Sequence, residues 1–252
     1  MTAKCRFMYE NVWDEGTVTA SSENSNFPCE NTQHPWPTRV WRSTSCLGTE
    51  WLKLELSDTP DVDVVIVWNH NLAEEGPGGG SIILEGNNTD DWATPAFTAI
   101  VDICGKYAVV FLPSTENYSW WRITFQDALN ADGFLAAGRV FLGSYFEPVR
   151  QYKRGGSFPR VDPSPAHFSE GHQLSSVVRD KYNQYQYQFK DSYEKDDFDE
   201  IFETVGNVHD LFFCETPATP CGATLYVRVA DWGWSPGVLT YWNLDLTLED
   251  YL

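Results

Sequence analysis

The stretch Glu50-Trp51-Leu52-Lys53-Leu54-Glu55-Leu56 decides how the first half of the chain is interpreted. Its leucines alternate with Lys53 and Glu55, and this period of two predicts a β-strand with one face buried and the other in water. The next apolar run, Val64-Val65-Ile66-Val67-Trp68, is apolar on both faces. It predicts a central strand, covered on both sides.

Short apolar segments of this kind also occur before and after these two segments. Between Thr17 and Phe146, short apolar runs are separated by Gly, Pro, Asn and Asp, a pattern typical of sandwiches and barrels of short strands. Strands are predicted at Glu50–Leu56, Asp63–Trp68, Ser81–Gly86, Ala96–Val101, Tyr107–Leu112, Trp120–Phe125 and Ala137–Tyr145. This part of the chain is therefore expected to be mainly β.

The last third combines strands with one helix. Phe198, Ile201, Phe202 and Val205 follow the spacing i, i+3, i+4, i+7, which predicts an amphipathic helix that Gly206 ends. Asp191 and Ser192 are candidates for its N-terminal cap. Strands are predicted before and after this helix, at Asp180–Phe189, Asp210–Cys214, Ala223–Asp231 and Thr240–Leu248.

A segment rich in proline, glycine and basic residues lies between the two parts, from Pro148 to Pro165. We expect a β-sandwich at 1–148, a linker or arm at 149–168 and a smaller β-rich domain with one helix at 169–252. An ordered arm would pair its basic residues with the acidic surface of a neighbouring subunit, and a solvated linker is the open alternative. Those basic residues are Arg150, Lys153, Arg154 and Arg160.

The charge of the chain argues against some partners. Seventeen Lys and Arg stand against 36 Asp and Glu, a formal net charge of -19, so phosphate backbones are repelled and nucleic acid is not an expected partner. No run of 18 apolar residues is present, and Met1–Gly16 lacks the pattern of a signal peptide. We expect a protein that is soluble when made and is not inserted into a membrane.

Six cysteines are scattered along the chain without a C-x-x-C spacing, which gives no support to a zinc or redox motif. Without an export signal, free buried thiols are expected. A bond between Cys214 and Cys221, across the turn at 215–220, is the open alternative. The six are Cys5, Cys29, Cys46, Cys104, Cys214 and Cys221.

Catalytic signatures are missing from the sequence. It contains no G-x-S-x-G, no H-E-x-x-H, no G-x-x-x-x-G-K and no dinucleotide fingerprint. Gly76-Pro77-Gly78-Gly79-Gly80 lacks the lysine of a phosphate-binding loop, and carboxylate pairs such as Asp90-Asp91 are typical of solvated loops. No enzymatic activity, cofactor or metal is therefore predicted, and a glycan depolymerase is a lesser alternative.

Aromatic residues in polar loops are the stronger functional signal. Sugar rings present apolar C–H faces that pack on flat aromatic side chains, while Asn, Asp and Arg bind the hydroxyl groups. Trp41 and Trp68 are expected in the core. The candidate carbohydrate-binding residues are Trp36, His70, Trp92, Asn69 and Asn87.

Several elements in order resemble discoidin domains, also called coagulation factor 5/8 type C domains. They include Ala20-Ser21-Ser22-Glu23, Phe27-Pro28, Asn31, Trp41-Arg42-Ser43, the strand at 50–56, Trp121-Arg122-Ile123-Thr124 and Gly138-Arg139-Val140-Phe141-Leu142-Gly143. The resemblance covers about Thr17 to Tyr145. It implies a jelly-roll β-sandwich whose loops at one end bind glycans, lipids or proteins.

The second part resembles the distal tail and lambda minor tail M proteins of long-tailed bacteriophages. The residues concerned are Lys181–Phe189, the helix ending at Gly206, Leu211–Phe213, Thr224–Val229 and Trp242–Glu249. This resemblance implies a belt-like domain that forms a ring, a hexamer in preference to a trimer. The order of the two domains is the reverse of the usual distal tail protein.

Together the two resemblances imply a structural component of a phage tail end. It would be made in the host cytoplasm, become part of the virion, and contact tail-tube and tail-tip proteins, and its sandwich would bind host carbohydrate. Repetition around a ring would strengthen weak glycan binding through avidity. A free carbohydrate-binding module or lectin without an assembly role is the alternative.

Overall fold

The computed structural model describes residues 4–74, 79–153, 157–168, 170, 172 and 174–251. Gly76–Gly78 of the glycine-rich stretch and Arg154 of the predicted linker or arm lie outside the described residues. The chain forms two compact units. The first comprises Met1–Glu147 and Phe212–Leu225, and the second comprises Pro148–Leu211 and Tyr226–Leu252.

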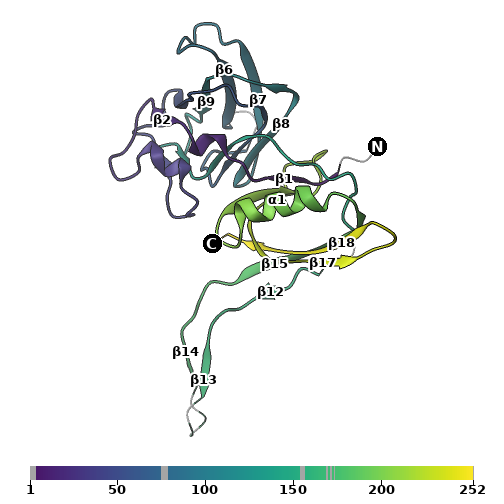
Figure 1. The fold of residues 1–252 in the computed structure, drawn as a ribbon. Coiled ribbons are helices and arrows are strands. Elements are labelled where there is room, and N and C mark those ends of the chain that lie inside the picture. Colours follow the sequence, from purple (N-terminus) through teal and green to yellow (C-terminus); the bar gives the residue numbers. More distant parts are fainter. Residues whose placement is uncertain are drawn as a thin grey trace. The chain divides into compact units, whose positions relative to one another are not determined.

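The first unit is a β-sandwich (Figure 1). One layer contains β11, β5 and β8, and the other contains β6, β9, β4 and β2. Its elements are β1 (Arg6–Met8), η1 (Val12–Asp14), β2 (Thr17–Ala20), η2 (Cys29–Gln33), β3 (Trp41–Arg42), β4 (Glu50–Glu55), β5 (Val62–Trp68), β6 (Ser81–Asn87), β7 (Phe97–Cys104), β8 (Tyr107–Glu116), β9 (Trp120–Gln126), β10 (Ala136–Ala137) and β11 (Val140–Gly143).

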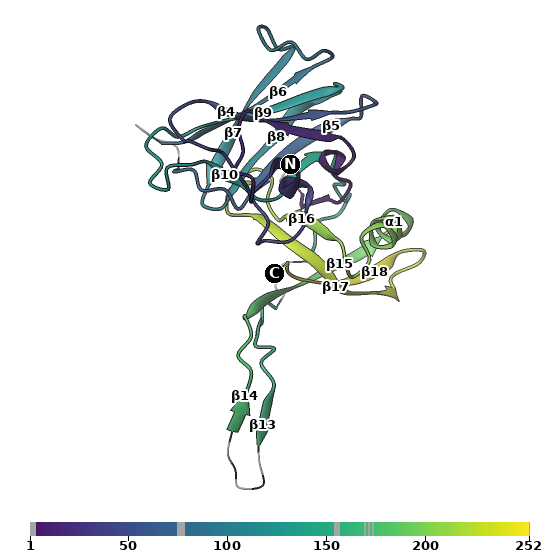
Figure 2. The same ribbon diagram turned by 90° about the vertical axis from the view of Figure 1, so that its left-hand side faces the viewer.

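Strand β7 joins the two layers (Figure 2). Its first part pairs antiparallel with β6, with Ile83 opposite Ile100, and its last part pairs with β8, with Cys104 opposite Tyr107. A single strand shared in this way keeps the hydrogen-bond ladder continuous where the sheet turns back on itself. The layers are therefore linked along one edge by backbone hydrogen bonds as well as by side-chain packing.

The core lies between the layers and follows the predicted alternation. Leu52 and Leu54 are buried in β4, whereas Trp51, Lys53 and Glu55 face outward. All five residues from Val64 to Trp68 are buried or partly buried in β5, which pairs with β11 on one side and β8 on the other. The predicted central strand is confirmed.

A chain segment from far along the sequence completes the first unit. Strand β16 (Asp210–Cys214) pairs antiparallel with β1, with Phe7 opposite Phe213, and both of these rings are buried. The sequence does not predict this return of Phe212–Leu225 to the sandwich. It makes the first unit discontinuous along the chain.

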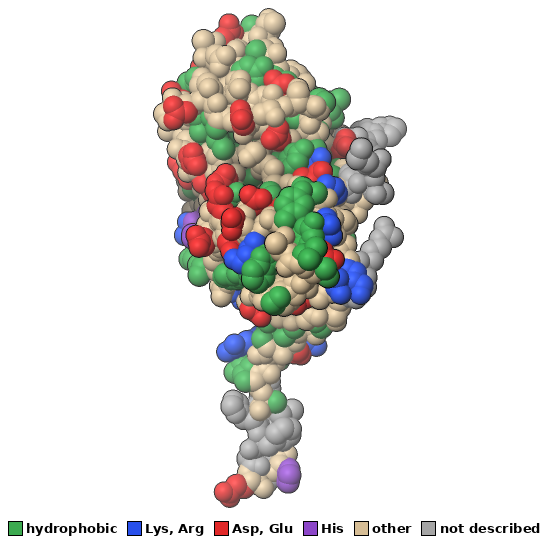
Figure 3. Space-filling model, turned by 45° about the vertical axis from the view of Figure 1, so that its right-hand side comes forward, with side chains coloured by type: hydrophobic (Ala, Val, Ile, Leu, Met, Phe, Trp, Pro, Cys, Tyr) green, Lys and Arg blue, Asp and Glu red, His purple; other side chains and the backbone are tan. Residues whose placement is uncertain are grey.

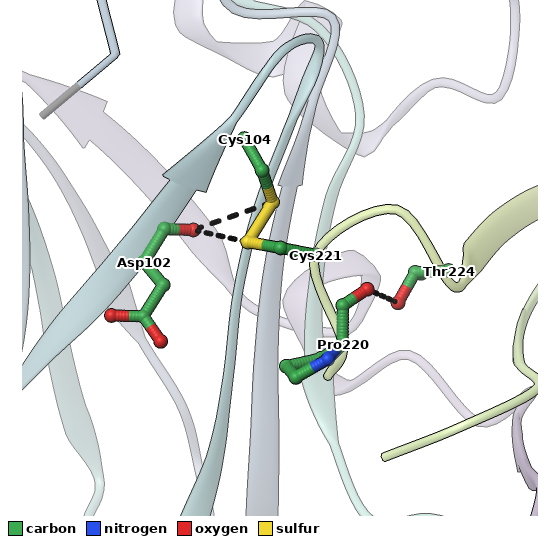
Figure 4. The surroundings of a disulfide bond; sticks show 5 residues. All are labelled: Asp102, Cys104, Pro220, Cys221 and Thr224. Atoms are coloured by element: carbon green, nitrogen blue, oxygen red, sulfur yellow. Dashed lines mark hydrogen bonds between the residues drawn. A yellow bond between two sulfur atoms is a disulfide. The ribbon is translucent and has the colours of Figure 1, made fainter. Parts of the chain in front are cut away.

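A disulfide between Cys104 and Cys221 fastens this returning segment (Figure 4). The expectation of free thiols is wrong for these two cysteines, and Cys221 does not pair with Cys214. The other four cysteines form no disulfide and are buried, as predicted. The pairing escapes sequence analysis because 117 residues separate the partners, and only the fold brings the β7–β8 turn next to Cys221.

The second unit is an antiparallel sheet with one helix on it (Figure 1). Strands β12 (Arg160–Val161), β15 (Tyr182–Ser192), β18 (Trp242–Asp250) and β17 (Thr224–Pro236) are adjacent in that order. Helix α1 (Lys195–Val205) carries the predicted buried residues Phe198, Ile201, Phe202 and Val205. Its rings pack on the sheet, with 5.1 Å between the ring centres of Phe202 and Trp232.

The ends of α1 differ slightly from the prediction. Glu194 occupies the N-cap position, and the backbone N–H of Glu194 donates to Ser192 Oγ at 3.2 Å. Ser192 therefore caps the turn before the helix rather than the helix itself. Gly206 ends the helix with a φ of 52°, a left-handed conformation that glycine adopts without a Cβ clash.

A hairpin extends from the edge of this sheet, as Figures 1 and 2 show. Strands β13 (Ala166–Phe168) and β14 (Leu174–Ser176) form a two-stranded sheet of their own. Nearer the unit, β12 pairs with β15. The predicted linker at 149–168 thus contains strand structure, and we call residues 162–181 the arm.

The predicted fold class is confirmed, because the protein is mainly β with one α-helix in the described residues. Within that part of the chain, no helix is long and apolar enough to cross a membrane. Figure 3 shows acidic side chains over much of one face, with hydrophobic side chains gathered beside lysine and arginine near its middle.

Because of the disulfide, we expect the free energy of unfolding to depend on whether a reductant is present. Because this bond closes a loop of more than 100 residues, its loss should lower the free energy of unfolding by about 4 kcal/mol. We expect Cys104→Ser and dithiothreitol-treated wild type to show the same loss in urea titrations. Reductant should not destabilise Cys104→Ser further, and a wild type equally stable with and without reductant would contradict the bond.

Candidate functional site

An exposed indole stands on the loop that follows η2. The Trp36 side chain belongs to a residue that is 54% exposed. The His34 ring meets it edge-on with 4.6 Å between ring centres, and the Arg39 guanidinium lies 5.1 Å from the indole centre. An aromatic surface and two side chains with hydrogen-bonding nitrogens are thus presented together.

An ion pair with a buried guanidinium anchors this loop. The Arg139 guanidinium is only 5% exposed and donates at 2.6 Å to each carboxylate oxygen of Asp14. It also donates to the carbonyl oxygen of Gln33 at 2.7 Å. A bidentate, charge-assisted pair of this kind fixes geometry more strictly than a single hydrogen bond. The base of the loop is therefore held in one position.

Asn69, which directly follows β5, also supports the loop that carries Trp36. The Asn69 side chain donates to the carbonyl oxygen of Pro37 at 3.1 Å, and its backbone N–H donates to Lys106 at 2.7 Å. Its φ is 58°, a conformation in which asparagine is enriched. The predicted site residue Asn69 thus lies beside the Trp36 loop and positions it.

His70 is buried, with 7% of its surface exposed. Its Nδ1 accepts a hydrogen bond from the backbone N–H of Leu72 at 3.2 Å, whereas Nε2 makes no hydrogen bond of good geometry. Burial lowers the pKa of His70, and a weaker interaction with the Tyr107 backbone opposes this shift. A neutral, enclosed imidazole of this kind is poorly placed to bind a ligand.

The other two predicted residues lie at a different place on the sandwich. Asn87 ends β6, while the loop with Asn69 and His70 leads into its start at Ser81. Seven residues of strand separate these ends by about 20 Å. The Trp92 indole packs on Arg122, with 4.6 Å from guanidinium to ring centre, and the Asn87 amide donates to the carbonyl oxygen of Asp91 at 2.5 Å.

The structure therefore divides the predicted site into two. Trp36, Asn69 and His70 share one end of the sandwich, and Trp92 and Asn87 belong to the outer face of the sheet. Trp41 is fully buried, as expected, and Trp68 is partly buried. His34 and Arg39 were not among the predicted site residues, although both flank Trp36 within the polar stretch His-Pro-Trp-Pro-Thr-Arg.

One cluster has the composition of a metal site. Potential ligand atoms of Glu23, Cys29 and Glu30 lie within 4.8 Å of one another. Burial, followed by the neighbouring carboxylates, raises the pKa of the Cys29 thiol to about 12. The thiol is therefore protonated at neutral pH, and Glu23 already accepts a hydrogen bond from the Cys29 backbone at 2.9 Å. We therefore interpret these three residues as a structural cluster.

Comparison with known proteins finds similar solved structures for about half of the chain. A chitosan-binding module from a Paenibacillus sp. IK-5 chitosanase/glucanase shares 16% identity and covers 54% of this chain and 99% of its own, with a TM-score of 0.41. The family 32 carbohydrate-binding module of Clostridium perfringens NanJ, in complex with galactose, shares 15% identity over 56% of this chain and 99% of its own, with a TM-score of 0.42.

A Streptococcus pneumoniae fucose-binding module gives a similar result, with 13% identity, 54% and 95% coverage and a TM-score of 0.40. The likeness is one of fold, to a β-sandwich of the carbohydrate-binding-module type. No protein-family model matches the sequence, and no curated protein matches it.

His70 gives a prediction about acid stability. Because its pKa is lowered in the folded protein, the unfolded chain takes up a proton first as the pH falls below about 6.5, and stability is lost there. We expect His70→Asn, whose amide oxygen can replace Nδ1, to lose less stability than wild type between pH 7.5 and pH 5. The free energy of unfolding of both proteins is measured by urea titration at the two pH values. If wild type and His70→Asn lose the same free energy between them, this assignment is contradicted.

Proposed function

We propose that the sandwich binds carbohydrate through the loop that carries Trp36. The observation that carries this proposal is a half-exposed indole on an anchored loop, with the His34 ring edge-on to it and the Arg39 guanidinium over its ring. The apolar face of a sugar ring packs on an indole, and the two basic side chains supply donors for hydroxyl oxygens. The loop is held by Arg139 and Asn69, so little ordering is needed on binding.

Trp36→Ala tests this proposal. Because more than half of the residue is exposed, the substitution should leave the melting temperature nearly unchanged while weakening glycan binding by tenfold or more, about 1.4 kcal/mol. Binding is measured on a glycan array and then by titration calorimetry with the sugars that score. The control is Trp242→Ala, which removes a partly exposed indole of the second unit.

Retention of full binding by Trp36→Ala would contradict the assignment of the loop. Failure of the wild-type protein to bind any glycan on the array would contradict carbohydrate binding at this site altogether.

A second candidate function is assembly into a phage tail, and the arm favours it. Residues 150–181, which comprise the arm and the segment that leads to it, contain six basic and three acidic residues, in a chain whose net charge is -19. Four of the basic residues precede the arm. The arm also exposes Val177 (65%) and Val178 (88%). Its two-stranded sheet has open edges, which proteins usually protect. We propose that residues 150–181 contact a second copy, with the basic segment before the arm on its acidic surface, and that copies assemble into a ring within the virion.

Removal of the arm tests self-association. Replacing residues 163–180 with Asn-Gly should preserve the β12–β15 pairing, because this dipeptide closes antiparallel strands. We expect wild type to sediment as an oligomer that dissociates with added salt. The shortened chain keeps the basic residues before the arm but lacks Val177, Val178 and the open strand edges, so it should dissociate at a higher protein concentration than wild type. A monomeric wild type at high concentration and low salt would contradict the assembly proposal.

A further inference from the structure

The outer face of strands β4, β9, β6 and β7 carries an unusual row of side chains. Directly opposite residues in antiparallel strands point to the same side of the sheet. Trp51 is opposite Thr124, Thr124 is opposite Ile83, and Ile83 is opposite Ile100. The flanking residues along these strands, such as Leu52, Ile123 and Ile82, are buried in the core. The row therefore faces away from the core.

This row is largely apolar although it reaches solvent. Ile100 is 66% exposed, and Trp51, Thr124 and Ile83 are partly exposed. Outer faces of sandwich sheets usually carry polar side chains. Four adjacent strands give the row a length of about 14 Å, from three interstrand spacings. We call it the apolar strip.

Hydrogen-bonding side chains border the strip on one side. Arg122 lies opposite both Lys53 and Glu85 in the sheet register. The Arg122 guanidinium donates to Glu85 at 2.6 Å, and Lys53 Nζ donates to both oxygens of Asp90 at 2.8 Å. Each cation thus has a carboxylate partner. This border offers donors and acceptors without a surplus of positive charge.

Indole rings reinforce the same border. Lys53 Nζ lies 5.1 Å from the ring centre of Trp51 and 5.4 Å from that of Trp120, and Trp92 covers Arg122 from the β6–β7 loop. The Trp92 indole N–H donates to Asp90 at 2.6 Å. These contacts fix the side chains before any ligand arrives, which lowers the entropic cost of binding.

The opposite border leads into a cavity. Gln126 and Ser81 are paired in register, and the Gln126 amide donates to Thr49 Oγ1 at 2.5 Å. These three residues line a cavity of about 430 Å³ whose wall also includes the exposed side chains of Leu47 and Leu129. The strip is therefore bounded by polar groups on both sides, and on one side the surface is hollowed.

The geometry points to an extended, uncharged polysaccharide as the occupant. We propose that the apolar strip is a second carbohydrate-binding site, separate from the Trp36 loop, which takes the flat faces of consecutive sugar rings while the two borders bind their hydroxyl groups. A single sugar would leave most of the strip exposed. An anionic chain is disfavoured because Lys53 and Arg122 are already neutralised and the protein is strongly acidic.

Binding of defined oligosaccharides tests the proposal. Cellohexaose, which is uncharged and extended, is titrated into the full-length protein by calorimetry, with maltohexaose and hexagalacturonate as a coiled and an anionic comparison. We expect cellohexaose to bind best. Ile100→Glu, at an exposed position that leaves the core intact, should weaken its binding at least tenfold, and Trp51→Ala should do the same.

Two controls separate this site from the loop site. In a protein that already carries Trp36→Ala, adding Ile100→Glu should still weaken the remaining cellohexaose binding at least tenfold, because the loop is not part of the strip. Leu239→Glu places the same charge at a position that is 90% exposed in the second unit and should also have no effect.

Unchanged cellohexaose binding in both Ile100→Glu and Trp51→Ala would overturn the strip as a site, and so would a wild type that binds none of the three hexasaccharides. Loss of binding in Trp36→Ala but not in Ile100→Glu would also overturn it, while supporting the loop site. The proposed function of the Trp36 loop is tested separately, by comparing wild type and Trp36→Ala on the glycan array.

Discussion

The burial of alternate side chains between two sheet layers is the constraint on which the sandwich depends. Leu52, Leu54, Ile123 and Phe125 enter the core together because their strands are paired in a fixed register. A shift of one residue would bring Trp51 and Lys53 inside and expose the leucines. The same constraint therefore decides which aromatic and charged side chains are presented to ligands on the outer face.

Local patterns were enough to predict much of the fold. The alternation at 50–56 and the four apolar positions of helix α1 each have a period that only one type of element satisfies. Strand boundaries moved by a few residues, for example from 107–112 to Tyr107–Glu116. The division into two units was less accessible, because β16 returns to β1 across about 200 residues, and no local period records such a contact.

The candidate sites show the same limit. A tryptophan in a polar turn was a sound signal for Trp36, which is exposed, but the same reasoning chose His70, which is buried. The residues that neighbour Trp36 and His70 in the sequence are similarly polar. What differs is the path of the chain after Asn69, where the backbone turns the imidazole inward toward Leu72. Likewise, the strip is assembled from four separate strands and has no signature in any one of them.

The return of Phe212–Leu225 to the sandwich also governs the order of events during synthesis. Cys104 has no partner until Cys221 has been made, and strand β1 has no β16 beside it until the chain has reached that same region. The N-terminal half therefore leaves the ribosome with an open sheet edge and an unpaired thiol. The first unit reaches its final form only after the chain has been made as far as Cys221, and by then the helix and several strands of the second unit have already been synthesised.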